Sequence, residues 1–156
     1  MRFSKLVKLE NIFVNLEAED REGAIREMVA HLEGNGELPK KHAEAVIDGL
    51  MERERLGTTG IGKGIAIPHV RHEPIESVLV AVGRSASGVD FASVDGERVR
   101  VIFLIIASEK QQDEYMAALR WVSSVGRDEY NNKLLSGAET AAGFLELFQD
   151  IEEDAS

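Results

Sequence analysis

Hydrophobic and polar residues follow two different periods along this chain. From Asp20 to Gly34, and again from Pro39 to Arg55, apolar residues recur every three or four positions, which predicts two amphipathic helices. Asp20 suits the N-cap of the first helix, and Gly57 follows the end of the second. The same period predicts further helices over residues 110–126, 129–135 and 138–151.

Strand-like segments lie between these helices. Residues 99–106 are apolar at nearly every position, so we expect a central strand that is covered by helices on both faces of a sheet. This alternation of helices and strands predicts an α/β fold with a small mixed β-sheet sandwiched between helices. Other strands are predicted at residues 12–16, 65–69 and 78–82, and the turn-rich stretch 83–96 contains an edge-strand pattern at 89–91.

The length and composition of the chain are those of one globular domain. It has 156 residues, of which 44% are hydrophobic, and no repeat or composition break marks a linker, so we expect a single domain over residues 1–156. The acidic end, residues 152–156, is expected to form a frayed tail. The chain contains no cysteine, which excludes disulfides, zinc–thiolate sites and thiol nucleophiles.

The charge of the chain limits its partners. The formal net charge is −10 at pH 7, which disfavours binding to nucleic acid or to anionic lipid and favours macromolecular partners with a basic face. No window reaches the roughly 20 apolar residues of a membrane span, and the first residues lack a secretory signal. We therefore expect a cytoplasmic protein that neither binds nucleic acid nor inserts into membranes.

The candidate chemistry lies in a glycine-rich segment that ends on a histidine. Gly60, Gly62 and Gly64 predict a loop whose backbone N–H groups bind an anion, and Pro68 stiffens the approach to His69. Arg53, Thr58 and Thr59, close by in the sequence, supply a cation and two hydroxyl donors. The segment therefore predicts phosphoryl transfer to His69 without a metal or another cofactor, with phosphate bound by the following residues: Thr58, Thr59, Gly60, Gly62 and Gly64.

Other interpretations of this segment are possible. The glycines are also compatible with a simple tight turn beside a half-buried histidine. Residues 57–63 contain the glycine and lysine spacing of a nucleotide-binding P-loop, but Gly64 stands where that motif needs Ser or Thr, and the order of strand and helix is reversed. A metal site at His69 and His72 is disfavoured because Arg71 lies between them. His31 and His42 are expected to be solvated helix residues.

The segment from Arg53 to His69 resembles the active-site segment of enzyme IIA of the mannitol/fructose class in the bacterial phosphoenolpyruvate-dependent phosphotransferase system, most closely its nitrogen-regulatory branch. The order of predicted elements is similar to that family over nearly the whole chain. The resemblance implies that His69 accepts a phosphoryl group from a histidine-containing phosphocarrier protein and that Arg53 assists. It also implies that Nε2 of His69 is phosphorylated while a backbone acceptor holds the other ring nitrogen.

One position departs from the family. Members commonly carry a second histidine at the start of the helix after the central strand, where this chain has Tyr115. A phenol donates a hydrogen bond but does not readily become a cation near neutral pH. Tyr115 and His72 are therefore candidates for supporting roles only.

Two functions remain open at this stage. The chain is either a phosphocarrier that accepts phosphate on His69 as a relay or regulatory signal, or a phosphorylation-impaired binding module that contacts a kinase, a permease domain or another transporter. Only the first would make it a component of an enzymatic phosphotransferase.

Overall fold

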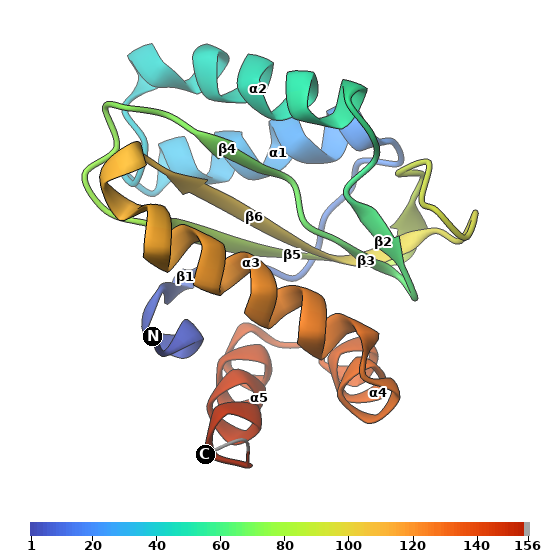
Figure 1. Ribbon diagram of the computed structural model, residues 1–156. Helices are drawn as coiled ribbons and strands as arrows, with labels where there is room; N and C mark the ends of the chain where they lie inside the picture. The colour runs from blue at the N-terminus through green and yellow to red at the C-terminus, as the bar shows by residue number, and fades with distance from the viewer. Residues whose placement is uncertain (155–156) are drawn as a thin grey trace.

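The computed structural model describes residues 1–154, in which six strands form one mixed β-sheet between two layers of helices (Figure 1). The strands follow the order β1-β5-β6-β3-β2, and β4 also pairs with β6. This architecture confirms the predicted α/β fold. The strands are β1 (Val7–Phe13), β2 (Gly60–Gly62), β3 (Ile65–Ala66), β4 (His69–Arg71), β5 (Leu79–Val89) and β6 (Val99–Ala107). The helices are α1 (Arg21–Gly34), α2 (Lys40–Arg55), α3 (Gln112–Arg127), α4 (Glu129–Gly137) and α5 (Ala141–Asp154), with short 3₁₀ turns η1 (Phe3–Lys5) and η2 (Glu109–Gln111).

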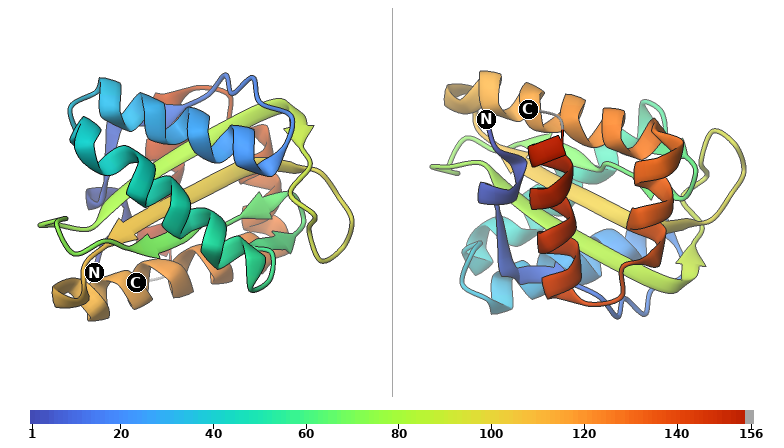
Figure 2. Two further views of the ribbon diagram at one scale, coloured as in Figure 1. Left: turned by 90° about the horizontal axis from the view of Figure 1, so that it is seen from above. Right: turned by 90° about the horizontal axis from the view of Figure 1, so that it is seen from below.

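Strand β6 is the centre of the hydrophobic core, as its uninterrupted apolar sequence predicts. Its side chains alternate between the two faces of the sheet, so neighbouring residues enter different clusters. Phe103 packs with α3, α4 and α5, whereas Leu104 packs with α1 and α2, and both are fully buried. Figure 2 shows the two layers from opposite sides, with α1 and α2 over one face and the three C-terminal helices over the other.

The helix boundaries agree with the sequence signals. Asp20 caps α1, since its Oδ1 accepts a hydrogen bond from the backbone N–H of Gly23 at 2.8 Å. Helix α2 ends at Arg55, two residues before Gly57. No helix within residues 1–154 has both the length and the apolar content needed to cross a membrane.

The segment predicted as one strand at 65–69 is divided in the structure. Both β3 and β4 run parallel to β6, with Ile65 opposite Val101 and His69 opposite Ile105. Between them, Pro68 has no N–H to donate, and its carbonyl accepts a hydrogen bond from Ile105 N at 3.0 Å. The register with β6 is the same on both sides of this interruption, and His69 begins the second segment.

Two other strands differ from their predicted positions. Strand β1 lies at 7–13, earlier than the expected 12–16, and the buried Leu16 lies beyond its end. Strand β5 continues to Val89 through the stretch predicted to be turn-rich, and its pairing with β6 resumes after an irregularity between Arg84 and Val89. The edge strand predicted at 89–91 is therefore largely the end of β5 and a single bridge from Asp90 to Asp20. Such irregular pairing depends on the partner strand and is weakly marked in sequence.

The acidic C-terminal segment is anchored up to the end of α5. Glu152 accepts hydrogen bonds from the backbone N–H of Ser4 at 2.6 Å and from its Oγ at 2.8 Å, and it pairs with Arg2 at 3.2 Å. The prediction of a frayed tail is therefore wrong for residues 152–154, and residues 155–156 lie outside the described part of the chain.

This anchor gives a stability prediction. Glu152→Ala leaves the partly buried N–H of Ser4 without its carboxylate acceptor, so we expect the free energy of unfolding to fall by about 1–3 kcal/mol. Glu146→Ala, on the exposed side of the same helix, should change it by less than about 0.5 kcal/mol. Urea unfolding followed by circular dichroism measures both values, and equal losses would contradict the anchoring role.

Candidate active site

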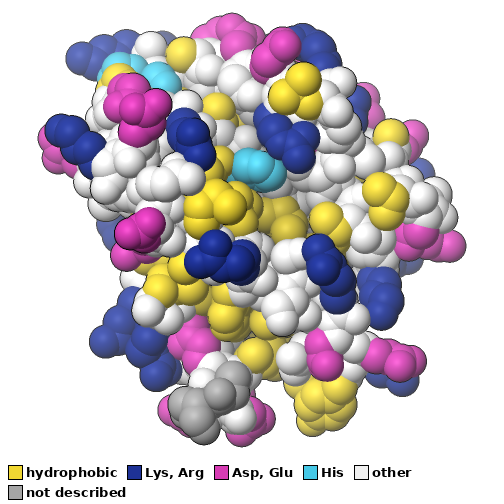
Figure 3. Space-filling view, in the orientation of Figure 1, with side chains coloured by type: hydrophobic (Ala, Val, Ile, Leu, Met, Phe, Trp, Pro, Cys, Tyr) yellow, Lys and Arg dark blue, Asp and Glu magenta, His cyan; other side chains and the backbone are white. Residues whose placement is uncertain are grey.

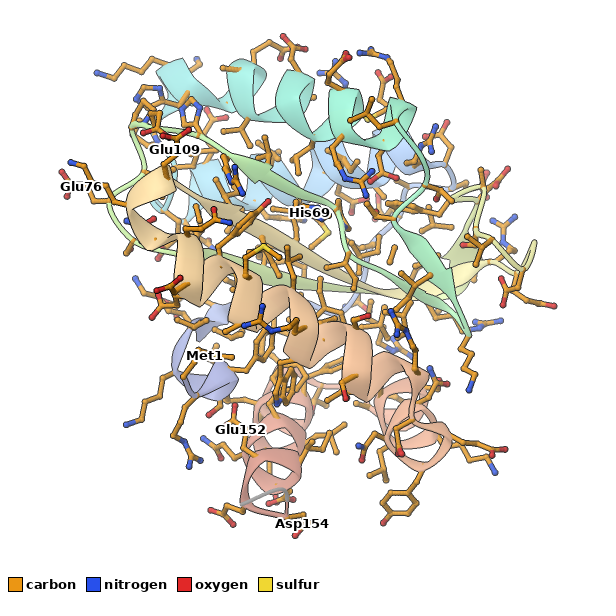
Figure 4. All side chains as sticks on the ribbon, viewed as in Figure 1. Met1, His69, Glu76, Glu109, Glu152 and Asp154 are labelled. Carbon is orange, nitrogen blue, oxygen red and sulfur yellow. The ribbon has the colours of Figure 1, made fainter. Side chains whose placement is uncertain are left out.

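An open cavity of about 520 Å³ lies where α2, β4 and α3 meet. Figure 3 shows a histidine near the middle of this face, among hydrophobic and basic side chains, and Figure 4 labels His69 there, between α2 and α3. The lining includes the predicted nucleophile and the predicted cation. The residues that line the cavity are Gly49, Glu52, Arg53, Leu56, His69, Val70, Arg71, Tyr115, Met116 and Leu119.

The ring of His69 is held by one backbone hydrogen bond. Its Nδ1 lies 2.6 Å from the carbonyl oxygen of Ile67. A carbonyl oxygen only accepts, so Nδ1 carries the hydrogen, and in the neutral ring Nε2 has the free lone pair. The arrangement leaves Nε2 as the ring nitrogen with a free lone pair, which is the nitrogen that the family resemblance implies to be phosphorylated.

The surroundings of His69 favour its neutral form. Burial lowers the pKa of the ring below its ordinary value of 6.5, and the positive charges of Arg53 and Arg71 lower the pKa further. The Ile67 carbonyl and the carboxylate of Glu54 act in the opposite direction but do not reverse the shift. At neutral pH the imidazole is therefore predominantly unprotonated and able to act as a nucleophile.

Arg53 lies in the last turn of α2, where a close helix–strand contact brings it to the cavity. A Cβ on Gly49, one turn earlier, would lie 2.6 Å from Cγ2 of Val70, so the glycine permits α2 to approach β4. The Nη1 of Arg53 donates to the carbonyl oxygen of Gly57 at 2.8 Å. This bond fixes one side of the guanidinium and leaves its other N–H groups for an anion.

The comparisons with known proteins agree with this geometry. Residues 5–151 match the family model described as "Phosphoenolpyruvate-dependent sugar phosphotransferase system, EIIA 2". The chain belongs to this EIIA family. This confirms the resemblance drawn from the segment that ends at His69.

Relatives of this EIIA chain include regulatory and sugar-specific proteins. It is 32% identical over 141 residues to a nitrogen regulatory protein of Bradyrhizobium diazoefficiens, covering 90% of each chain. It is 33% identical over 147 residues to the fructose-specific EIIABC component of Bacillus subtilis, but spans only 23% of that protein. The crystal structure of nitrogen regulatory protein IIA-Ntr from Neisseria meningitidis matches with a TM-score of 0.83 at 26% identity, covering 93% of this chain and 97% of that one.

Tyr115 and Arg71 complete the charged and aromatic lining of the EIIA cavity. The ring centroids of His69 and Tyr115 lie 6.0 Å apart, and Cζ of Arg71 lies 5.7 Å from the Tyr115 centroid. Burial raises the pKa of Tyr115 to about 12, so its phenol keeps its proton at neutral pH. Sequence reasoning missed Arg71 as a site residue, although the alternation of a strand places residues 69 and 71 on the same side.

Glu54 is a second functional candidate that sequence reasoning missed. Its carboxylate is buried and accepts hydrogen bonds from Thr59 N at 3.0 Å and Thr59 Oγ1 at 2.6 Å, while Arg21 lies 3.6 Å away. The side chain thus ties the start of α1 and the segment after α2 to the end of α2. The signal in the sequence is a carboxylate four residues after the buried Leu50, on the apolar side of the helix, where a charge requires partners.

The glycine-rich segment is a β-hairpin, so the prediction of an open loop is wrong. Strand β2 pairs antiparallel with β3, and Lys63 and Gly64 between them both have positive φ, as tight hairpin turns require. Thr58 Oγ1 donates to the carbonyl of Phe91 at 2.7 Å. The five residues predicted to bind phosphate do not line the cavity, and their binding of phosphate stays a prediction: Thr58, Thr59, Gly60, Gly62 and Gly64.

The structure places His72 away from the cavity, beside His42, with ring centroids 5.0 Å apart. His42 is therefore half-buried against another ring, and its prediction as a solvated residue is wrong, whereas His31 is exposed as expected.

Within residues 1–154 no three His, Asp or Glu side chains are grouped to hold a metal ion. The glycine segment follows helix α2 and precedes strand β3, the reverse of the order in a P-loop.

Proposed function

We propose that this EIIA chain is a phosphocarrier that accepts a phosphoryl group on Nε2 of His69 from a histidine-containing phosphocarrier protein. The observation that carries the proposal is the hydrogen bond from Nδ1 of His69 to the Ile67 carbonyl, which leaves Nε2 unprotonated in the neutral ring. The chain acts in the cytoplasm and passes the phosphoryl group to a further protein or uses it as a regulatory signal.

The transfer is an in-line displacement between two imidazoles. The Nε2 lone pair of His69 forms the new P–N bond, while the P–N bond of the donor breaks and its electron pair returns to the donor ring. No proton has to be removed from His69 first. The protein contributes position and charge, because the free N–H groups of Arg53 face the cavity in which three phosphoryl oxygens must be bound.

Both a relay and a regulatory role have support among the relatives. The nitrogen regulatory protein of Bradyrhizobium diazoefficiens is matched over 90% of its length, and a fructose-specific EIIA component of Haloferax volcanii over 96%. In either role, phosphorylation adds up to about two negative charges beside two arginines. That change offsets the positive charge of the two arginines and so alters which partner the face prefers.

The direct test is phosphorylation in a reconstituted system. The chain is incubated with phosphoenolpyruvate, the first enzyme of the system and its phosphocarrier protein, and its intact mass is measured. We expect one acid-labile phosphoryl group, located on His69 by peptide mapping and absent when the phosphocarrier is left out. An unchanged mass, with the carrier itself phosphorylated, would contradict the proposal and favour the phosphorylation-impaired binding module.

The lowered pKa of His69 predicts the pH dependence of the transfer. Only the neutral ring attacks phosphorus, and the folded-state pKa lies below 6.5, so the fraction of reactive His69 should be constant from about pH 7 upward and should fall as the pH drops below about 6. The unfolded chain, in which His69 keeps its ordinary pKa, binds this proton more readily than the folded chain does. The free energy of unfolding should therefore fall as the pH drops through the same acidic range. An NMR titration of the imidazole checks the prediction, and a midpoint above 6.5 would contradict it.

A further inference from the structure

Arg71 lies two residues beyond His69 on β4, with its guanidinium over the ring of Tyr115. Because side chains alternate along a strand, His69 and Arg71 project from the same side of β4. The Cζ of Arg71 is 5.7 Å from the Tyr115 centroid, within the range of a cation–π contact. The Tyr115 ring in turn lies 6.0 Å from the ring of His69, so it holds a second guanidinium beside the nucleophile.

The positive charge of Arg71 is not neutralised within the described residues. Among the ion pairs of residues 1–154, none involves Arg71, whereas Arg55 pairs with Glu52 and Arg21 with Glu54. Under the proposed function, a phosphoryl group on His69 brings an anion into the cavity that Arg71 lines. Within this part of the chain, the side chain thus has an aromatic support but no anionic partner.

We propose that Arg71, supported by the face of the Tyr115 ring, binds the phosphoryl group on His69 and stabilises the phosphorylated chain. This inference rests on the proposed function. Arg71 forms and breaks no covalent bond in the transfer; its N–H groups donate to phosphoryl oxygens in the cavity that Arg53 also lines. Tyr115 is a positioning residue that acts through Arg71.

A guanidinium in this place keeps its own charge throughout the neutral range. The groups that face the phosphoryl position are Arg53 and Glu52 on α2, His69 and Arg71 on β4, and Tyr115 on α3. Guanidinium groups stay charged and the phenol of Tyr115 stays protonated through the neutral range, and Glu52 pairs with Arg55. A histidine at position 115 would instead lose its charge near its own pKa of about 6.5.

The test measures the equilibrium of the phosphoryl group between the phosphocarrier protein and this chain. Arg71→Gln should shift the equilibrium about tenfold toward the unphosphorylated chain, and Arg71→Lys should shift it less, because the charge remains but the planar fork is lost. Tyr115→Leu should act like Arg71→Gln, whereas Tyr115→Phe keeps the ring and should stay within about twofold of the wild type. Circular dichroism confirms that each variant is folded.

The pH dependence and a charge control separate contact from general electrostatics. The ratio between wild type and Arg71→Gln should be the same at about pH 7.5 and about pH 8.5, because the guanidinium does not titrate there and His69 is predominantly neutral in both chains. Arg120→Gln removes one exposed charge from α3 and should have little effect. A shift equal to that of Arg71→Gln in this control, or wild-type behaviour of Arg71→Gln, overturns the inference and leaves the proposed function intact. A wild-type chain that accepts no phosphoryl group overturns both.

Discussion

His69→Asn is expected to leave the chain folded and unable to accept a phosphoryl group. The asparagine amide can keep a donor near the position of Nδ1, so the carbonyl of Ile67 retains its hydrogen bond, while the nitrogen with the free lone pair is removed. Because no other group replaces that lone pair, transfer should fall below detection, a loss of more than about 10⁴-fold. Intact-mass measurement after incubation with the phosphorylated carrier records the result.

The matched control for this variant is His42→Asn. His42 is also half-buried, but it packs against His72 outside the cavity, so phosphorylation should proceed at the wild-type rate. His69→Ala serves as a second test, because it also removes the donor to Ile67 and should cost about 1–3 kcal/mol of stability. If His69→Asn still gains an acid-labile phosphoryl group, the nucleophile is another residue and the assignment of His69 is wrong.

The sequence predicted the layers of the fold because the strongest signals are local. The apolar residues of β6 and the helical period of α1 and α2 can each be recognised within one segment. The division of residues 65–69 into two strands cannot, since it depends on which residues of β6 they pair with. The extension of β5 to Val89 also cannot be recognised within one segment. Its composition is typical of turns, and it forms a strand because it pairs with β6.

The lining of the cavity could be predicted only in part, because some of its residues meet through long-range packing. His69 and Arg53 were identifiable because they lie in one segment, but the hairpin that follows Arg53 directs the glycines away from the cavity. Arg71 and Tyr115 meet only through the packing of α3 against the sheet, which a single sequence does not display. The overall charge of −10 also conceals the sign at the cavity, where the two arginines face one glutamate that is already paired. The net charge therefore does not predict the sign of charge inside the cavity.

Arg53→Ala is expected to slow phosphoryl transfer to His69 by about 10²-fold to 10³-fold, the usual cost of removing one group that stabilises developing charge. The guanidinium is held by the Gly57 carbonyl at 2.8 Å, so it binds the oxygens without first losing much side-chain freedom. Because the group acts on the transferring phosphoryl rather than on docking, kcat should fall while KM for the phosphorylated carrier changes little. Arg53→Lys should give an intermediate rate, since an ammonium keeps the charge but not the fork.

The control for Arg53 is Arg120→Ala, on α3. Arg120 is exposed and does not line the cavity, so its removal changes the net charge equally and should leave kcat within about twofold. A second readout separates electrostatics from folding: Arg53 lowers the pKa of His69, so Arg53→Ala should raise that pKa toward 6.5 and move the acidic fall in rate to higher pH. A slow variant with an unchanged imidazole titration would mean that Arg53 acts at a distance from the His69 ring. A variant with the wild-type rate would show that Arg53 has no role in the transfer.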